Sequence, residues 1–405
     1  MKPLLPVDDA TRRLLEAAVP VTDSETLPLA ECDGRVLSAD LAALLTQPPF
    51  DASAMDGYAL RSTDAPEIGS VLTVIGQAAA GHAFAGTLGE GQAVRIFTGA
   101  PVPEGADTIL IQEDAEVLEG GKIRTTFKVT AGRHIRPRGQ DFAQGETILK
   151  AGRELGFTDL TLAAAMNHAA LAVYRKPRIA ILATGDELLP PGSTPNPAQI
   201  IASNTFGVAA LARQAGADVL DLGIIADDDT LIRAAIGKAV AAKVDVLVTL
   251  GGASVGDHDL VQAALKAEGM QLDFWRIAMR PGKPLMVGAI GTMQVLGLPG
   301  NPVASLVCSL LFLEPLIRRI ARRAPPERAA TVRTATPLKE NDHRQDYLRA
   351  RLRTDENGKR VAEAYAKQDS SMMNILAHSD VLIIRPPHAP EAPAGTECPV
   401  IKLRT

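Results

Sequence analysis

The segment RKPRIAILATGDEL, Arg175 to Leu188, decides the fold because a strongly apolar run ends abruptly in Gly, Asp and Glu. The run 179–184 has the length and near-continuous apolar character of a strand buried on both faces. Beyond it, apolar runs alternate with helical patterns: helix 204–216, strand 217–225, helix 229–242, strand 244–252 and helix 259–269. This alternation predicts a parallel α/β sheet covered by helices on both faces. A buried helix over 302–322 is expected to close the block.

The chain has a different character on both sides of this α/β block. Residues 8–19 have a helical pattern, and from residue 27 to about residue 150 short β-rich runs are separated by Gly and Pro. Helical character returns at 158–166. After residue 326, two strand-like runs flank DENG, whose Asn357-Gly358 pair is typical of a hairpin turn. The sequence therefore predicts a multidomain protein of the α/β plus β class.

Composition and charge exclude some classes of function. The 405 residues are 46% hydrophobic and only 3% aromatic, and the net charge is −5. Few aromatic rings and a negative charge disfavour a nucleic-acid-binding protein. A phosphate-bearing ligand would therefore need a local cluster of cations.

Cysteine usage and apolar runs bear on the compartment. Cys32, Cys308 and Cys398 have no metal-ligand spacing, which favours reduced thiols. The first residues lack the apolar core of a signal peptide. The longest apolar run, 302–316, is interrupted by polar residues and proline, so we do not expect it to span a membrane. These observations predict a soluble, cytoplasmic protein.

Four loops leave the carboxyl ends of the predicted strands, where parallel sheets bind ligands. They are TGDELLPPG after residue 184, ADDD after 225, GGASVGDHD after 250 and LPGNP after 298. Backbone amides at such Gly- and Asp-rich turns are suited to anion binding. One such loop alone is more often a cap or a turn. Four on one edge of a sheet indicate a ligand site.

The third loop places Gly251 and Gly252 beside Ser254. It matches neither a dinucleotide-binding fingerprint nor a P-loop, although its backbone is able to approach a phosphate closely. His258 in the same loop is more typical of a surface residue than of a metal ligand.

The next segment, FWRIAMRPGKPL, brings three cations close together in sequence: Arg276, Arg280 and Lys283. In a strand, residues four apart project from the same face, so we expect Arg276 and Arg280 to point the same way. A solvated surface strand is the alternative. The apolar surroundings and the flanking Gly-rich loops favour a cationic clamp for an anion.

Carboxylates share this rim with the cations. They are Asp186, Glu187, Asp227, Asp228, Asp257 and Asp259. Carboxylates repel a bare phosphate, so a site that holds both requires a bridging divalent cation, typically Mg²⁺.

A further carboxylate lies outside the α/β block, in SAMDGYALR, Ser53 to Arg61. Asp-Gly is first of all a turn signal, because Gly tolerates positive φ and Asp caps nearby amides. This pattern alone leaves open whether Asp56 belongs to a site.

Together, the motifs resemble those of the molybdopterin molybdenumtransferases, the bacterial enzymes and gephyrin-like relatives that complete molybdenum-cofactor synthesis. The matching segments, in the family's order along nearly the whole chain, are SAMDGYALR, RIFTGAPVPEGADTIL, ATGDELLPPG, GGASVGDHD, FWRIAMRPGKPL and GLPGNPVAS.

The resemblance implies four domains and an elongated homodimer with active sites shared between subunits. The implied domains are a discontinuous linker domain (1–50 with 140–175), a β-rich domain (51–139), a molybdopterin-binding α/β domain (176–325) and a small C-terminal β domain (326–405).

The resemblance also assigns site residues. Catalytic roles fall to Asp56, Thr98, Glu187, Asp227 and Asp259, with Asp56 lining the pocket of the partner subunit and the four carboxylates holding Mg²⁺. The residues expected to bind substrate or anion are Gly251, Gly252, Ser254, Arg276, Arg280, Lys283, Pro299, Gly300, Arg349 and Ser370. Family members usually carry lysine where this chain has Arg276 and Arg280. Arginine keeps the charge but offers a planar fork, which leaves the molybdate geometry open.

The reaction implied by the resemblance is hydrolysis of adenylylated molybdopterin coupled to insertion of molybdate, with release of AMP and molybdenum cofactor. The expected partners are a second copy of the chain and the adenylyltransferase that supplies the substrate. Two alternatives share the same α/β core. One is a molybdopterin adenylyltransferase, which would lack the flanking β domains, and the other is a non-catalytic scaffold.

Overall fold

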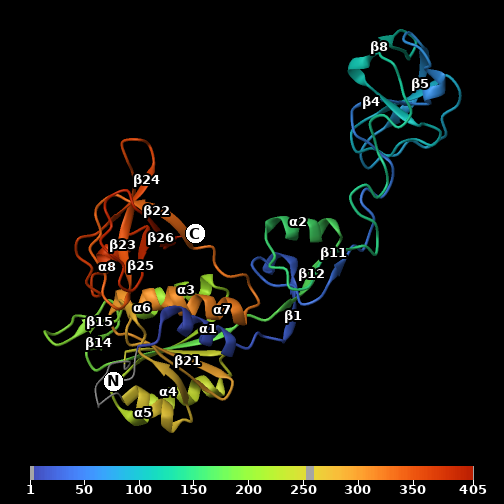
Figure 1. Cartoon of the computed structure of the whole chain (residues 1–405). Coiled ribbons are helices and arrows are strands. Elements are labelled where there is room, and N and C mark those ends of the chain that lie inside the picture. Colours follow the sequence, from blue (N-terminus) through green and yellow to red (C-terminus); the bar gives the residue numbers. More distant parts are fainter. Residues whose placement is uncertain (1–3, 252–259, 405) are drawn as a thin grey trace. The chain divides into compact units, whose positions relative to one another are not determined.

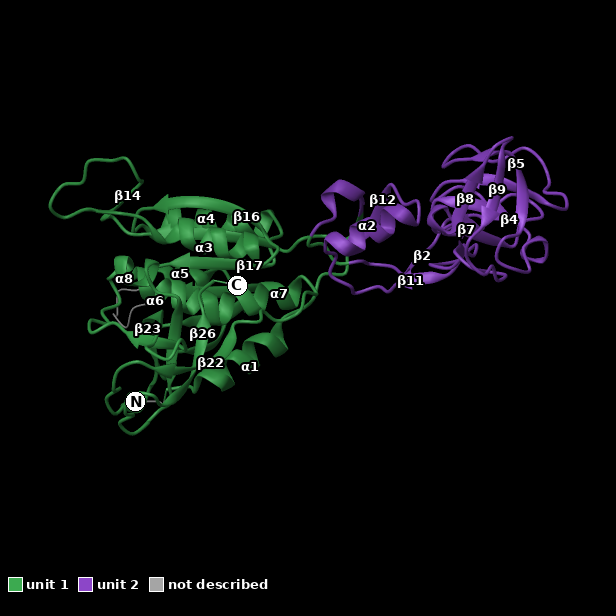
Figure 2. Cartoon of the chain, turned by 90° about the horizontal axis from the view of Figure 1, so that it is seen from above, with its two compact units in different colours: residues 1–25, 34–36, 174–405 green, residues 26–33, 37–173 purple. Residues whose placement is uncertain are grey.

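The structure is a computed structural model that describes residues 4–251 and 260–404. It contains two compact units (Figures 1 and 2). Unit 1 comprises residues 1–25, 34–36 and 174–405, and unit 2 comprises residues 26–33 and 37–173.

The α/β sheet of unit 1 has six strands in the order β16-β13-β17-β21-β20-β18. Their bounds are β13 (Arg178–Thr184), β16 (Asp218–Ile225), β17 (Val246–Leu250), β18 (Gln271–Trp275), β20 (Met286–Ile290) and β21 (Met293–Leu298). The first four strands in this order are parallel, as predicted. The last two strands pair antiparallel with their neighbours, β20 with β21 and the edge strand β18 with β20. Only Gly291 and Thr292 separate β20 from β21, and so short a connection forms a hairpin rather than a crossover.

Helices cover both faces of this sheet, as expected (Figure 1). They are α1 (Val7–Ala17), α3 (Asn204–Gln214), α4 (Asp229–Ala241), α5 (Leu260–Ala267), α6 (Pro302–Cys308), the π-helical turn η4 (Ser309–Leu313) and α7 (Glu314–Ile320). Alternate residues of β13 enter two separate cores. Ile179 and Ile181 pack with α1, α3 and the α6–α7 segment, whereas Ala180 and Leu182 pack with α4 and α5. The strand is therefore buried on both faces.

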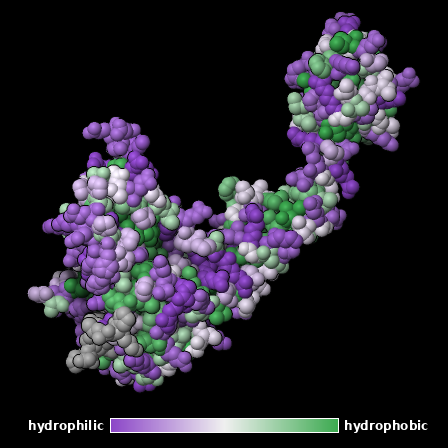
Figure 3. Space-filling model, viewed as in Figure 1, coloured by the Kyte–Doolittle hydropathy of each residue, from purple (hydrophilic) through white to green (hydrophobic). Residues whose placement is uncertain are grey.

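The C-terminal part of unit 1 forms a second six-stranded sheet, in the order β19-β23-β24-β22-β26-β25, with β23 also pairing β25. Its elements are β19 (Met279–Arg280), β22 (Ala329–Thr334), β23 (Gln345–Thr354), β24 (Arg360–Ala364), β25 (Val381–Arg385), β26 (Glu397–Lys402) and helix α8 (Met373–Ala377). The predicted hairpin is present, with Thr354 opposite Arg360 and Gly358 at a φ of +74°. Hydrophilic residues cover this hairpin on the face shown in Figure 3. Because β19 comes from the α/β segment, the two parts of unit 1 share a sheet.

Unit 2 contains a six-stranded sheet in the order β7-β4-β6-β5-β9-β8. Its strands are β4 (Gly57–Leu60), β5 (Val71–Ala78), β6 (Gln92–Ile96), β7 (Thr108–Ile111), β8 (Ala115–Leu118) and β9 (Lys122–Thr125). Tyr58 and Leu60 pack into one core, whereas Ala59 packs into another. The predicted β-rich region between residues 27 and 150 is thus confirmed.

The remaining elements are short. They are β1 (Ser24–Pro28), η1 (Leu29–Glu31), β2 (Leu41–Ala42), β3 (Ala52–Ser53), η2 (Ser62–Asp64), η3 (Gln112–Asp114), β10 (Ile135–Arg136), β11 (Thr147–Leu149), α2 (Phe157–Ala165), β12 (Ala170–Tyr174), β14 (Leu188–Leu189) and β15 (Ile200–Ile201). Helix α2 lies where helical character was predicted. The exact four-domain boundaries stay a prediction. Within the described residues, every helix is too short or too polar to cross a membrane.

Candidate active site

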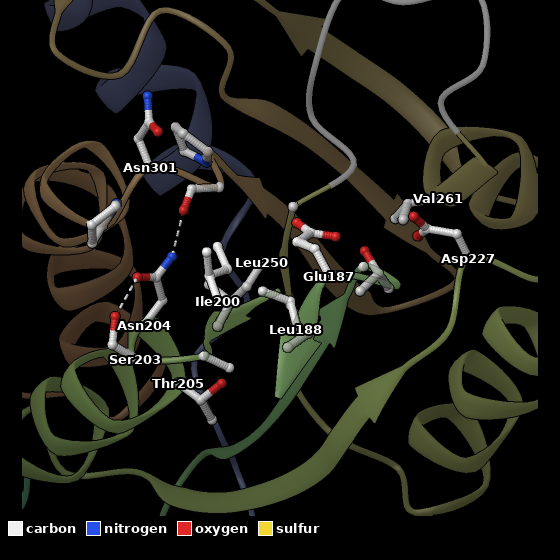
Figure 4. A pocket seen from close by; sticks show the side chains of 18 of the residues that line it. Glu187, Leu188, Ile200, Ser203, Asn204, Thr205, Asp227, Leu250, Val261 and Asn301 are labelled. Carbon is white, nitrogen blue, oxygen red and sulfur yellow. Dashed lines mark hydrogen bonds between the residues drawn. The ribbon is translucent and has the colours of Figure 1, made fainter. Parts of the chain in front are cut away.

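A cavity of about 700 Å³ lies at the carboxyl ends of the parallel strands of unit 1 (Figure 4). Residues from all four predicted loops line it: Gly185 and Glu187 follow β13, Asp227 follows β16, Gly251 follows β17, and Pro299 and Gly300 follow β21. The complete lining is Ala183, Thr184, Gly185, Glu187, Leu188, Ile200, Ile201, Ala202, Ser203, Asn204, Thr205, Asp227, Leu250, Gly251, Leu260, Val261, Pro284, Pro299, Gly300, Asn301 and Pro302. Residues that follow all four parallel strands therefore meet at the carboxyl edge of the sheet, as predicted.

Two glycines allow close contacts between neighbouring atoms around the cavity. Gly251 has a φ of +95°, and a Cβ there would lie 2.9 Å from the carbonyl oxygen of Thr184. Gly185 has a φ of +150°, and a Cβ there would lie 2.5 Å from a carboxylate oxygen of Glu187. A larger residue at either position would strain the backbone and displace its neighbours. Gly185 thus leaves room for the carboxylate of Glu187 to fold back over the rim.

The carboxylates of the rim repel one another. The backbone N–H of Asp227 donates to a carboxylate oxygen of Asp186 at 3.0 Å. The pKa of Asp227 is raised by its partial burial and by the negative charges of Asp186 and Glu187. Asp228 has a different role, because it caps helix α4 by accepting from the N–H of Leu231 at 2.9 Å. Glu187 and Asp227 are therefore the acidic groups of the described cavity.

The predicted metal ligands form no complete cage in the part of the chain that the structure describes, where no group of three or more His, Cys, Asp or Glu side chains is arranged to hold an ion. Two hard carboxylates on the cavity wall, Glu187 and Asp227, remain. Mg²⁺ commonly binds one or two protein carboxylates and takes its other ligands from substrate phosphates and water. The donor set fits a cation that arrives together with a phosphate-bearing substrate.

The wall formed by residues 299–302 is held by two asparagines that the sequence did not single out. Asn204 donates from Nδ2 to the carbonyl oxygen of Gly300 at 2.7 Å (Figure 4). Asn301 donates from Nδ2 to Oγ of Ser370 at 2.9 Å. The predicted residue Ser370 is thus brought to the edge of the cavity through Asn301.

The predicted shared face of Arg276 and Arg280 is wrong. Arg276 follows β18 with a φ of +77°, which ends that strand, while Arg280 lies in β19. The guanidinium of Arg276 stacks on the ring of Trp275, 4.8 Å from its centroid. The two arginines therefore do not lie in one strand, and the strand period that predicted their shared face does not apply.

Arg280 is already engaged by carboxylates. Its Nε donates to Asp346 at 2.8 Å, a second nitrogen bonds the other oxygen of Asp346, and Asp342 lies 3.6 Å away. The side chain of Lys283 is exposed. Within the described residues, Arg276, Arg280 and Lys283 all lie outside the lining of the cavity.

Arg349 is one of the largest fully buried side chains of the described chain. It donates to the carbonyl oxygens of Tyr347 at 3.4 Å and Asp369 at 3.2 Å. Burial lowers its pKa to about 10. The structure places it beneath the residues around Ser370, away from the lining of the cavity.

The structure brings together two predicted residues of unit 2. One carboxylate oxygen of Asp56 accepts from the backbone N–H of Thr98 at 2.7 Å and from its hydroxyl at 2.8 Å. These bonds, together with the charge of Arg95, hold the pKa of Asp56 below its ordinary value. The guanidinium of Arg95 lies 5.0 Å from the ring centroids of both Tyr58 and Phe97.

Asp56-Gly57 is not the tight turn that its sequence suggests. Gly57 starts β4 instead of adopting a positive φ. A Cβ on Gly57 would lie 2.0 Å from the carbonyl oxygen of Leu110 on the neighbouring strand β7. The glycine is needed for close strand approach, and Asp56 occupies the bend just before the strand.

Three predicted site residues, Gly252, Ser254 and Asp259, lie outside the described residues. The same holds for Asp257 and His258.

Three family models match successive parts of the chain. The model described as "MoeA N-terminal region (domain I and II)" matches residues 5–167, "Probable molybdopterin binding domain" matches 180–319, and "MoeA C-terminal region (domain IV)" matches 331–403. The solved structure of a molybdopterin biosynthesis MoeA protein from Pyrococcus horikosii is 28% identical, with a TM-score of 0.84 and complete coverage of both chains.

Curated relatives extend the similarity over almost the full length. A molybdopterin molybdenumtransferase of Haemophilus influenzae is 33% identical over 385 residues, covering 94% of each chain. One of Bacillus subtilis is 34% identical over 409 residues, covering 99% of this chain and 94% of the relative. The chain belongs to the molybdopterin molybdenumtransferase family.

Proposed function

We propose that this protein is a molybdopterin molybdenumtransferase, which hydrolyses the phosphoanhydride of adenylylated molybdopterin, inserts molybdate at the dithiolene and releases AMP and molybdenum cofactor. The observation that carries the proposal is the cavity of unit 1, which is lined by residues that follow all four parallel strands of a molybdopterin-binding domain. Matches to the N- and C-terminal MoeA regions on either side favour this enzyme over an adenylyltransferase built from the α/β domain alone.

The negative charge of the cavity lining means that an anionic substrate needs a cation to bind there. The lining contains Glu187 and Asp227, and the substrate is an anion. Like charges repel strongly in a partly desolvated site. We propose that Mg²⁺ joins the cavity lining to the substrate. Glu187, Asp227 and phosphate oxygens of the substrate would hold the ion. Once bound, this ion would act as a Lewis acid on the phosphoanhydride.

The side chains of this chain have separate tasks in the proposed site. Glu187 and Asp227 would hold the cation that binds the phosphate end of the substrate. The turn 299–302 and the apolar side chains of Leu188, Ile200 and Leu250 enclose the remainder and exclude water. Ser370, fixed by Asn301, presents its hydroxyl at the edge of the same cavity.

Asp56 and Thr98 enter the proposal as groups supplied by a second copy of the chain. Two hydrogen bonds from Thr98 and the charge of Arg95 stabilise the anion of Asp56 and lower its pKa. A fixed carboxylate of this kind is suited to orient a bound cation or an attacking water. We therefore propose a homodimer with composite sites, acting in the cytoplasm and supplied by a separate adenylyltransferase.

A reconstituted assay tests the function directly. Purified protein is incubated with adenylylated molybdopterin, molybdate and Mg²⁺, and two products are followed: AMP by chromatography, and molybdenum cofactor by activation of a cofactor-free molybdoenzyme. We expect AMP release and activation to rise together, and both to stop when a chelator removes the cation. AMP release without activation of the apo-enzyme in any condition would reject the proposed function.

A further inference from the structure

Asn204 joins two walls of the cavity. It is the first residue of helix α3, is half-buried and lines the cavity. Its amide nitrogen donates to the carbonyl oxygen of Gly300 at 2.7 Å, across 96 residues of sequence (Figure 4). The bond fixes the turn 299–302 to the start of a helix that is itself anchored in the core through Val208 and Ala212.

The same turn is supported on two further sides. Asn301 bonds Ser370, and the backbone N–H of Val303 donates to the carbonyl oxygen of Ser370 at 3.0 Å. A Cβ on Gly300 would lie 3.9 Å from the Cα of Gly251, so the turn also packs against the loop after β17. The contact from Asn204 links the turn directly to the start of helix α3.

The chemistry at this contact suits an asparagine. The acceptor is a neutral carbonyl, so the partner has to supply a hydrogen-bond donor, and the amide of Asn204 does so at short reach. Aspartate has the same shape but would place an oxygen against an oxygen. The hydroxyl of Ser203 reaches Oδ1 of Asn204 only at 3.5 Å, so it orients the amide weakly.

We infer that Asn204 is a positioning residue for substrate binding, acting through Gly300 to hold the turn 299–302 at the width that admits adenylylated molybdopterin. The inference rests on the proposed function, because it names the group that shapes the same cavity. A net hydrogen bond of about 1 kcal/mol corresponds to roughly a fivefold to tenfold change in affinity.

The test compares two variants, Asn204→Ala and Asn204→Asp, with the unchanged chain. We expect the KM for adenylylated molybdopterin to rise about fivefold to tenfold in both, and kcat to change less than threefold. Hydrogen exchange should quicken in peptides covering 299–308, because the N–H of Val303 loses protection, and stay unchanged in helix α4. Aspartate in the first turn of a helix is favourable, so Asn204→Asp should keep its melting temperature.

A matched control is Asn196→Ala, which removes an asparagine that only shapes its own loop by accepting from the N–H of Ala198 at 2.9 Å. It should leave KM and the exchange of 299–308 unchanged. Unaltered KM in both Asn204 variants overturns the inference, as does a general loss of exchange protection across unit 1, which would show a purely structural role. If the unchanged chain itself fails to release AMP, the proposed function fails, and the exchange difference in 299–308 still decides whether Asn204 fixes the turn.

Discussion

Two carboxylates of this chain, Asp56 and Asp227, face opposite electrostatic situations. Asp56 accepts two hydrogen bonds from Thr98 and lies near Arg95, and its pKa is lowered. Asp227 lies beside Asp186 and Glu187 in a partly desolvated rim, and its pKa is raised. Hydrogen bonds and a nearby cation stabilise the first anion, whereas burial and like charges outweigh the backbone hydrogen bond that Asp186 contributes to the second.

The difference in pKa indicates that Asp56 and Asp227 have different roles. A carboxylate that is already satisfied is pre-organised and loses little on binding. A carboxylate held among like charges stores repulsion that a cation relieves, so binding and catalysis gain what stability loses. The acidic rim of unit 1 is therefore the place where a cation has most to contribute.

The largest expected effect comes from neutralising one carboxylate on each side of the comparison. Glu187→Gln and Asp56→Asn should each slow cofactor formation by about 10²-fold, the scale of losing a pre-organised electrostatic group. The measurement is the initial rate of apo-enzyme activation at saturating molybdate. Asp228→Asn is the control, since asparagine also caps a helix, and should stay near the unchanged rate. Comparable rates in all variants would remove both assignments.

Mixing the two defective chains tests whether Asp56 and Glu187 act across subunits. In a mixed dimer with composite sites, one site contains both defects and the other is intact. Random assembly should therefore restore about a quarter of the unchanged activity. Native mass spectrometry confirms that mixed dimers form. Mixed dimers without recovered activity would place both residues in one chain's site.

The sequence was sufficient for the parts of the fold that depend on local pattern. The apolar run 179–184 and the helix–strand alternation fixed four parallel strands and the edge at which their loops meet. The prediction that Arg276 and Arg280 lie in one strand was wrong because the structure of this segment depends on pairing with distant parts of the chain. Arg276 breaks its strand with a positive φ, and Arg280 joins β23, whose Asp346 is 66 residues away.

The sequence did not single out Asn204 and Asn301 for the same reason, because their roles depend on contacts with distant residues. Asn204 follows Ser203 at a helix start, where the sequence signals only a cap, and its partner Gly300 is far along the chain. Arg349 was assigned to the site by resemblance alone, and the sequence did not indicate that its side chain is buried. The pairing of Asp56 with Thr98 was suggested only by resemblance, since spacing does not show that the two motifs meet.

A smaller effect concerns stability. Because the pKa of Asp227 is raised in the folded state, its ionised form is disfavoured there, so the carboxyl lowers stability as pH rises through its ordinary pKa and beyond. Asp227→Asn should raise the melting temperature at pH 7 by about 1 °C while reducing activity. The gain should vanish below the ordinary pKa of aspartate, where both states bind the proton. Calorimetry at pH 7 and at low pH distinguishes this from a pH-independent gain, which would contradict repulsion as the cause.

The smallest expected effect falls on Thr98, because its backbone contributes more than its side chain to the lowered pKa of Asp56. Thr98→Val removes only the hydroxyl bond of 2.8 Å and keeps the backbone N–H at 2.7 Å. The pKa of Asp56 should then move upward toward its ordinary value, so that the carboxylate still ionises at neutral pH. We expect the rate at pH 7 to fall by about threefold and the acid side of the pH–rate profile to shift to higher pH. A loss as large as that of Asp56→Asn, with an unshifted profile, would instead mean that the hydroxyl of Thr98 contacts the substrate.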